Sequence, residues 1–210
     1  MVSAKPAAGT DIAQRRNHMQ PIKVVTSNTV SHLKQKAKAL KREKNISHLE
    51  ALDAVAISAG FNHWHDVTQA NERLKPAETS FMKGCVFAFD IKDGLDIDSD
   101  GGILIHDQFL ELFCDKSLFK YFCQMCKEDD PDAFELDSEE DIREEFKECF
   151  DFMFFRLRDD LANKTVKECI ALASKESFFS PHILWHNQVM VDTYNVPSFD
   201  EQGNLIAIRF

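Results

Sequence analysis

The hydrophobic positions of residues 25–74 repeat at helical spacing and predict three short helices. The first helix, over residues 27–45, has an apolar face that consists of Val30, Leu33, Ala37 and Leu40. The second begins after Ser47, which forms a capping box with Glu50, and its apolar face consists of Leu49, Leu52, Ala56 and Ala59. Gly60 suits the left-handed position that closes this helix, and a third helix follows over residues 63–74. We therefore predict a three-helix, helix-turn-helix-like module over residues 25–74.

After residue 80 the hydrophobic positions alternate with polar ones in some segments and repeat at helical spacing in others. Strands are predicted at residues 85–92, 103–106, 186–197 and 204–210. Helices are predicted over residues 107–127 with a break near Asp115, from Ser138 to Asn163, and around residues 165–175. In the helix from Ser138, Phe152 and Phe155 lie off the main apolar stripe, and we expect both to be covered within the chain.

These patterns predict an α+β fold, with a small basic three-helix module followed by an acidic, Phe-rich α+β domain over residues 81–210. Residues 75–80, with the sequence KPAETS, are predicted as the linker between the two. Residues 1–24 lack hydrophobic periodicity and are expected to form a flexible arm.

Charge is divided unevenly along the chain. Residues 1–45 carry ten bases and two acids, a net charge of +8, whereas residues 46–210 carry 15 bases and 33 acids, a net charge of −18. A basic segment attracts phosphate, and an acidic body repels nucleic acid. The two regions therefore favour different partners, although an ordinary helix with solvated lysines would carry the same charges.

Composition excludes several classes of protein. Apolar residues make up 44% and charged residues 29% of the 210, which excludes a wholly disordered or collagen-like chain. No apolar run approaches the roughly 20 residues of a membrane-spanning helix. Only 7 glycines are present, which disfavours a glycine-rich nucleotide loop. No secretory signal is recognisable in residues 1–24, so we expect a cytoplasmic protein with reduced thiols.

The bases of the first helix are candidate phosphate ligands in a nucleic-acid site over residues 30–74. They are Lys34, Lys36, Lys38, Lys41, Arg42 and Lys44. In a helix-turn-helix arrangement the third helix would enter the groove, where His63 and Gln69 are candidates for hydrogen bonds to base edges. That helix has no arginine before Arg73, and a three-helix unit that packs on a protein partner would show the same pattern.

Residues 36–67 resemble a known family. A basic helix is followed by the pattern SHxxALxxxAxxxGFxxW, here Ser47, His48, Ala51, Leu52, Ala56, Gly60, Phe61 and Trp64. This is similar to the small helical domain of proteobacterial and plasmid-borne proteins labelled glyoxalase-related. The resemblance covers about a fifth of the chain and implies a bacterial accessory protein of mobile-element origin. Glyoxalase chemistry needs a metal held on a β-scaffold, and since these residues are predicted to be helical, no enzyme activity is transferred.

An acidic stretch matches most of a calcium-binding loop. Its candidate ligands are Asp96, Asp98, Asp100 and Asp107, with Gly101 at the turn. Position twelve is Asp107 rather than a bidentate glutamate, and the preceding segment is predicted as a strand. We therefore expect an acidic turn that binds no specific divalent cation, and we predict no cofactor.

Cysteine and histidine spacing gives only weak metal signals. Cys123 and Cys126 have C-x-x-C spacing, but a zinc site needs two further ligands and no second pair stands nearby. We therefore predict buried thiols and no metal site. His182 and His186 share a face of an extended segment, without a predictable acidic partner.

Together these features predict a non-enzymatic accessory protein whose basic helices bind nucleic acid, or a partner that itself binds nucleic acid. The acidic body would contact a protein partner through residues 128–163. One alternative is an inhibitor or antitoxin-like factor whose acidic surface, residues 128–145, docks on a basic target. Another is an enzyme with an unfamiliar site, although no common catalytic motif is present.

Overall fold

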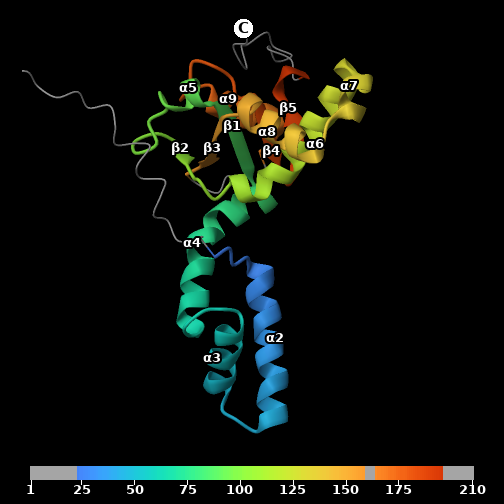
Figure 1. The fold of residues 1–210 in the computed structure, drawn as a ribbon. Helices are drawn as coiled ribbons and strands as arrows, with labels where there is room; N and C mark the ends of the chain where they lie inside the picture. Colours follow the sequence, from blue (N-terminus) through green and yellow to red (C-terminus); the bar gives the residue numbers. More distant parts are fainter. Residues whose placement is uncertain (1–22, 159–163, 196–210) are drawn as a thin grey trace, which may run out of the picture. The chain divides into compact units, whose positions relative to one another are not determined.

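The structure, a computed structural model, describes residues 23–158 and 164–195. The chain divides into two compact units, Met1–Arg73 and Leu74–Phe210, each of which is described by itself (Figure 1). The α+β fold class is confirmed, because the second unit combines helices with a five-stranded antiparallel sheet. The arm predicted over residues 1–24 lies outside the described residues except for Lys23 and Val24.

The first unit is helical, as predicted. Its elements are α2 (Ser27–Lys44), α3 (His48–Ser58) and the beginning of α4 (Trp64–Lys83). The capping box of α3 is present: the Ser47 hydroxyl accepts a hydrogen bond from the Glu50 amide at 3.2 Å, and the Glu50 carboxylate accepts one from the Ser47 amide at 2.9 Å. Hydrogen bonds from Ser47 lower the pKa of the Glu50 carboxyl.

The apolar faces of these helices meet in one core. Its buried members are Val25, Val30, Leu33, Ala37, Ala51, Leu52, Val55, Ala56 and Val67. The face predicted for α3 is partly wrong, since Leu49 is 66% exposed and Val55 only 5% exposed. Two pairs at i, i+4 spacing, Ala51 with Val55 and Leu52 with Ala56, form the face that is buried.

Residues 75–80, predicted as a linker, are helical and belong to α4. Leu74 and Ala77 are buried and Phe81 is half-buried, which continues the helical spacing of apolar residues past Pro76. Pro76 has no amide hydrogen to donate, but the burial of one helix face outweighs the loss of that bond.

The second unit is built around an antiparallel sheet with the strand order β2-β3-β1-β4-β5. The strands are β1 (Cys85–Asp90), β2 (Leu104–His106), β3 (Phe152–Leu157), β4 (Ile183–His186) and β5 (Val189–Asp192). On β1, Phe87 pairs with Phe155 of β3, and Cys85 pairs with His186 of β4. β1 is the central strand, and its residues from Cys85 to Phe89 are all buried.

Helices cover both faces of this sheet. They are α5 (Ile91–Gly94), α6 (Glu111–Asp129), α7 (Pro131–Leu136), α8 (Glu139–Cys149) and α9 (Val166–Ala173), with a 3₁₀ turn at Thr193–Asn195. Alternate residues of β1 face opposite ways. Val86 and Ala88 pack with α6 and α8, while Phe87 and Phe89 pack with α9.

The helix predicted from Ser138 to Asn163 is too long. α8 ends at Cys149, and Phe152–Leu157 form strand β3. Phe154 and Phe155 point into the cores on opposite faces of the sheet, which is why this run is apolar at consecutive positions. The expectation that Phe155 is covered within the chain is confirmed, because its side chain is fully buried.

The single strand predicted at residues 186–197 is wrong, because β4 ends at His186, β5 covers Val189–Asp192 and a 3₁₀ turn follows at Thr193–Asn195. α6 runs without the break predicted near Asp115, and it begins at Glu111 rather than at residue 107. Residues 128–145 form the end of α6, α7 and the beginning of α8. The terminal strand predicted at residues 204–210 lies outside the described residues.

Candidate nucleic-acid interface

Four basic side chains follow one exposed face of α2. Lys34, Lys38, Lys41 and Arg42 are spaced i, i+4, i+7 and i+8, so they lie in a row along the helix. All four are exposed. This row, called the basic stripe below, contains four of the six candidate phosphate ligands of the helix.

The other two candidates, Lys36 and Lys44, do not share this face. Val30, Leu33 and Ala37 bury one side of α2 and thereby fix which sides meet solvent. Lys36 lies on the flank across the buried side from the stripe, and Lys44 continues the line of the buried residues at the end of the helix. The structure therefore does not bring all six bases together.

The basic stripe is electrostatically unfavourable for the isolated helix. Lys34 and Lys38, and again Lys38 and Arg42, are like charges at i, i+4 spacing, and each such pair costs about 0.2–0.5 kcal/mol. Within residues 23–158 and 164–195, no carboxylate forms an ion pair with any stripe residue. Lys41 and Arg42 are favourable in one respect, since cations in the last turn stabilise the carboxyl end of a helix.

A tight turn joins α3 to α4. Gly60 has a φ of +84°, and the amides of Gly60 and Phe61 donate to carbonyl oxygens in the last turn of α3 at 2.9 and 3.0 Å, as in a Schellman motif. The Trp64 amide donates to the Asp53 carboxylate of α3 at 2.8 Å, which ties the start of α4 to α3. Two helices joined in this way are compatible with a helix-turn-helix arrangement.

The exposed surface at the start of α4 is less suited to phosphate than α2. His63 is 53% exposed, and its Nδ1 lies 3.1 Å from the Asp66 carboxylate. Gln69 is exposed, but Asp66 and Glu72 lie on the same side of the helix. Two carboxylates there would repel a phosphate backbone, so α2 is the stronger candidate for the contact.

The aspartate loop is organised by the chain itself. The Asp98 carboxylate accepts hydrogen bonds from the amides of Gly101 and Asp100, both at 3.0 Å, and these bonds lower the pKa of that carboxyl. The Arg158 guanidinium donates to the carbonyl oxygens of Ser99, Asp100 and Gly102 at 2.8–2.9 Å. The carbonyl oxygen of Gly102, which is position seven of the calcium pattern, therefore already accepts a hydrogen bond from the cationic Arg158 side chain.

The four aspartates of the calcium pattern do not converge. Among the described residues, no group of carboxylates that includes Asp96, Asp98, Asp100 or Asp107 brings three oxygens within 4.8 Å of one another. Asp107 instead binds Arg156 at 2.9 Å. The expectation that this loop takes no specific divalent cation stays a prediction, with a geometric reason in its favour.

The C-x-x-C cysteines lie on α6, where Cys123 and Cys126 are both half-buried. Burial and the nearby Glu145 carboxylate raise the pKa of the Cys126 thiol. Cys114 is fully buried, and burial raises the pKa of its thiol well above the usual range. Cys114 belongs to the core beneath α6 and is the buried thiol that the sequence predicts, whereas Cys123 and Cys126 are partly buried and pack against that core.

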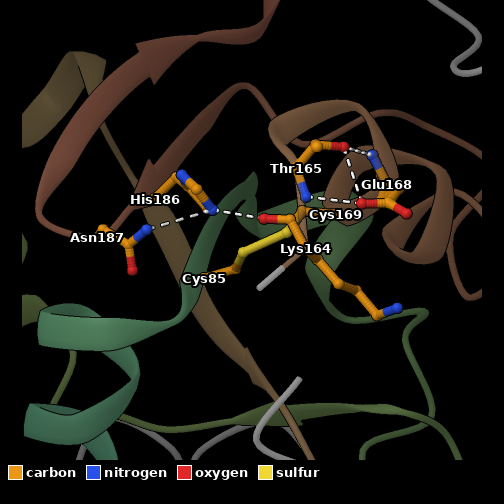
Figure 2. Close-up of a disulfide and its surroundings, with 7 residues drawn as sticks. All are labelled: Cys85, Lys164, Thr165, Glu168, Cys169, His186 and Asn187. Atoms are coloured by element: carbon orange, nitrogen blue, oxygen red, sulfur yellow. Dashed lines mark hydrogen bonds between the residues drawn. A yellow bond between two sulfur atoms is a disulfide. The ribbon is translucent and has the colours of Figure 1, made fainter. Parts of the chain in front are cut away.

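Two other cysteines form a disulfide, so the expectation that the thiols are reduced is wrong for them. Cys85 of β1 and Cys169 of α9 are bonded although they are 84 residues apart, and His186 of β4 lies beside them (Figure 2). The three ligand atoms, two Sγ and one ring nitrogen, all lie within 4.8 Å of one another. No local spacing reveals this group, because strand register and the placement of α9 bring it together.

An acidic surface covers α7 and its flanks, where residues 128–145 carry eleven acids and one base. It contains a pocket of about 230 Å³ lined by Cys126, Asp129, Asp130, Phe134, Asp137, Ile142 and Glu145. Leu136, at the end of α7, is 87% exposed. The surface thus combines dense negative charge with the exposed apolar side chain of Leu136.

No helix in the described part of the chain is long and apolar enough to cross a membrane. A comparison with protein-family models, with curated proteins and with solved structures finds no match for this chain. The resemblance of residues 36–67 to a family labelled glyoxalase-related therefore stays a prediction.

Proposed function

We propose that the first unit binds nucleic acid and that the basic stripe of α2 supplies its phosphate contacts. The observation that carries this proposal is the alignment of Lys34, Lys38, Lys41 and Arg42 on one exposed face without ion-pair partners among the described residues. A phosphate backbone would relieve the like-charge repulsion within the row. A cytoplasmic location goes with this proposal, because nucleic acid is available there.

The dimensions of the stripe suit a short stretch of backbone. At 1.5 Å of rise per residue, Lys34 and Arg42 are about 12 Å apart along the helix axis. One strand of duplex DNA places a phosphate about every 3.4 Å along its axis, so the row spans about three to four phosphates. Phosphate contacts carry no sequence information, and the proposal therefore concerns affinity rather than sequence preference.

The test is a binding titration of the full chain with labelled duplex DNA, single-stranded DNA and RNA, at several salt concentrations. The triple variant Lys38→Glu, Lys41→Glu and Arg42→Glu should lose measurable binding to whichever nucleic acid the wild type binds. A matched control reverses three exposed lysines of the second unit, Lys116, Lys120 and Lys147, and so changes the net charge equally. Circular dichroism confirms that both variants are folded. Unchanged affinity in the stripe variant, or equal loss in the control, would refute the proposal.

A second candidate function is binding of a basic protein partner by the acidic surface of residues 128–145. The observation in its favour is the pocket bordered by Asp129, Asp137 and Glu145, beside the exposed Leu136. Such a pocket suits a lysine or arginine side chain, and Leu136 offers an apolar contact next to it. An arginine-rich peptide should bind the wild type and lose affinity when Asp129, Asp137 and Glu145 are changed to their amides. Equal binding by both proteins would remove this surface from consideration.

A further inference from the structure

Three elements of the second unit place Cys85, Cys169 and His186 around one point. Cys85 and His186 are paired directly across β1 and β4, so their side chains lie on the same face of the sheet. α9 covers that face and contributes Cys169, which packs in the same core as Cys85. Figure 2 shows the disulfide beneath the imidazole of His186.

The residue types and their separations match a metal site. Zinc is held by cysteine sulfur at about 2.3 Å and histidine nitrogen at about 2.0–2.1 Å, so tetrahedral ligands lie about 3.5–3.8 Å from one another. The three ligand atoms here already lie within 4.8 Å of one another. The Cα atoms of Cys85 and Cys169 are 6.9 Å apart, so the two sulfurs can separate to this spacing by side-chain rotation.

We propose that Cys85, Cys169 and His186 bind one Zn²⁺ ion when the Cys85–Cys169 disulfide is reduced, with water as the fourth ligand. Reduction by a low-molecular-weight thiol or a phosphine supplies two electrons, and with two protons it converts the disulfide into two thiols. Zinc then displaces both thiol protons, so two Zn–S bonds form and two protons are released. The disulfide form cannot bind the ion in this way, because neither sulfur is a thiolate.

A hydrogen bond to the backbone orients the imidazole of His186. Its Nε2 lies 2.7 Å from the carbonyl oxygen of Lys164 and 3.5 Å from Asn187 Nδ2. Since a carbonyl only accepts, the shorter contact places a proton on Nε2 in the disulfide form. Figure 2 shows this nitrogen on the side of the ring that faces the two sulfurs. Metal binding exchanges this hydrogen bond for a Zn–N bond, with the ring proton on Nδ1.

Zinc fits these ligands better than other common ions. Two thiolates and an imidazole are the ligands that zinc takes in proteins, whereas calcium and magnesium take oxygen. Cys123 and Cys126 are less suitable, because among the described residues they belong to no group of three ligand atoms that all lie within 4.8 Å of one another. Bound zinc would join β1, β4 and α9, so it should stabilise the reduced chain.

The test measures zinc bound to the full chain after reduction with a phosphine and removal of excess metal. One equivalent per chain is expected for the reduced protein and none for the disulfide form, with a rise in the melting temperature of the reduced protein when zinc is added. Co²⁺ in place of zinc should give a thiolate-to-metal absorption band. His186→Gln and the double variant Cys85→Ser, Cys169→Ser should lose the bound equivalent and this band.

Two matched controls keep the test specific. The double variant Cys123→Ser, Cys126→Ser and the single variant His182→Gln should both retain one equivalent of zinc. Alkylation mapped by mass spectrometry needs no variant: zinc should protect Cys85 and Cys169, and Cys149, which is exposed, should react with or without zinc. A reduced, folded chain that binds no zinc would overturn the proposal. So would loss of zinc in the Cys123 and Cys126 variant, or alkylation of Cys85 and Cys169 that zinc does not slow.

Discussion

Arg156 and Asp107 form an ion pair that is largely withdrawn from solvent. The Arg156 Nε lies 2.9 Å from the Asp107 carboxylate, and the two side chains are 17% and 10% exposed. Arg156 belongs to β3, and Asp107 follows directly after β2, so the pair fastens the edge strand of the sheet to its neighbour. The aspartate that the sequence places at the end of a calcium pattern therefore has a structural partner.

Asp107→Ala should lower the free energy of unfolding by about 2–4 kcal/mol, because it leaves the Arg156 guanidinium largely buried without a counter-charge. Asp115→Ala is the matched control, since Asp115 pairs with Arg143 at 3.5 Å and the two side chains are 45% and 40% exposed. That pair should contribute less than about 1 kcal/mol. Urea denaturation measures both changes, and equal effects would contradict the distinction between buried and exposed pairs.

Phe155→Ala should destabilise the second unit by about 3–5 kcal/mol and lower its melting temperature. Phe155 is fully buried, and its ring packs edge-on against Phe89 with centroids 5.6 Å apart. Phe178 is 66% exposed, so Phe178→Ala should change stability far less. If Phe155→Ala left the melting temperature unchanged while association with a partner was lost, Phe155 would belong to an interface rather than to the core.

Gly60→Ala should cost about 1–2 kcal/mol in the first unit, because a Cβ is disfavoured at a φ of +84°. Asn45 is the other described residue of this unit with a positive φ, at 50°. Asn45→Gly relieves strain there and should not lower stability by more than a few tenths of a kcal/mol. Thermal denaturation of both variants tests whether Gly60 needs its left-handed backbone conformation. A Gly60→Ala variant with unchanged stability would contradict this.

The raised pKa of Tyr121 leads us to expect that the protein loses stability at alkaline pH. Burial, together with the hydrogen bond that its hydroxyl donates to Asp192 at 2.9 Å, raises the pKa of Tyr121 to about 12 from an ordinary value of 10. Tyr121 thus keeps its proton to higher pH in the folded state than in the unfolded state. The contribution of Tyr121 to the free energy of unfolding is therefore complete below about pH 10 and is lost as the pH rises towards about 12. Tyr121→Phe should remove this part of the pH dependence. In a spectrophotometric titration of the folded protein, a Tyr121 phenol that ionises near pH 10 would contradict the prediction.

Local signals in the sequence are sufficient for the helix ends at Ser47 and Gly60 and for the apolar face of α2. The capping box at Ser47, the left-handed Gly60 and the apolar face of α2 each depend on residues within one or two turns, and all three are present in the structure. Residues 75–80, predicted as a linker from their composition, are helical because the helical spacing of apolar residues continues through Leu74 and Ala77.

Tertiary contacts decide the features that the sequence leaves open. The run from Phe152 to Leu157 is apolar on both faces, and only its place between β1 and β2 makes it a strand. The Cys85–Cys169 disulfide and its neighbour His186 depend on register across β1 and β4 and on the packing of α9. Of the candidate interface, the sequence identifies the basic residues, but burial of one side of α2 decides which four of them share a face.

The salt dependence of binding tests most directly whether the basic stripe contacts phosphates. For four contacts with duplex DNA, a plot of log K against log salt concentration should have a slope of about −3.6. The neutral variant Lys38→Gln, Lys41→Gln and Arg42→Gln should bind more weakly, with a slope flatter by about 2.7. The same change at Lys116, Lys120 and Lys147 should leave the slope as it is. A stripe variant with the wild-type slope would contradict phosphate contact by α2.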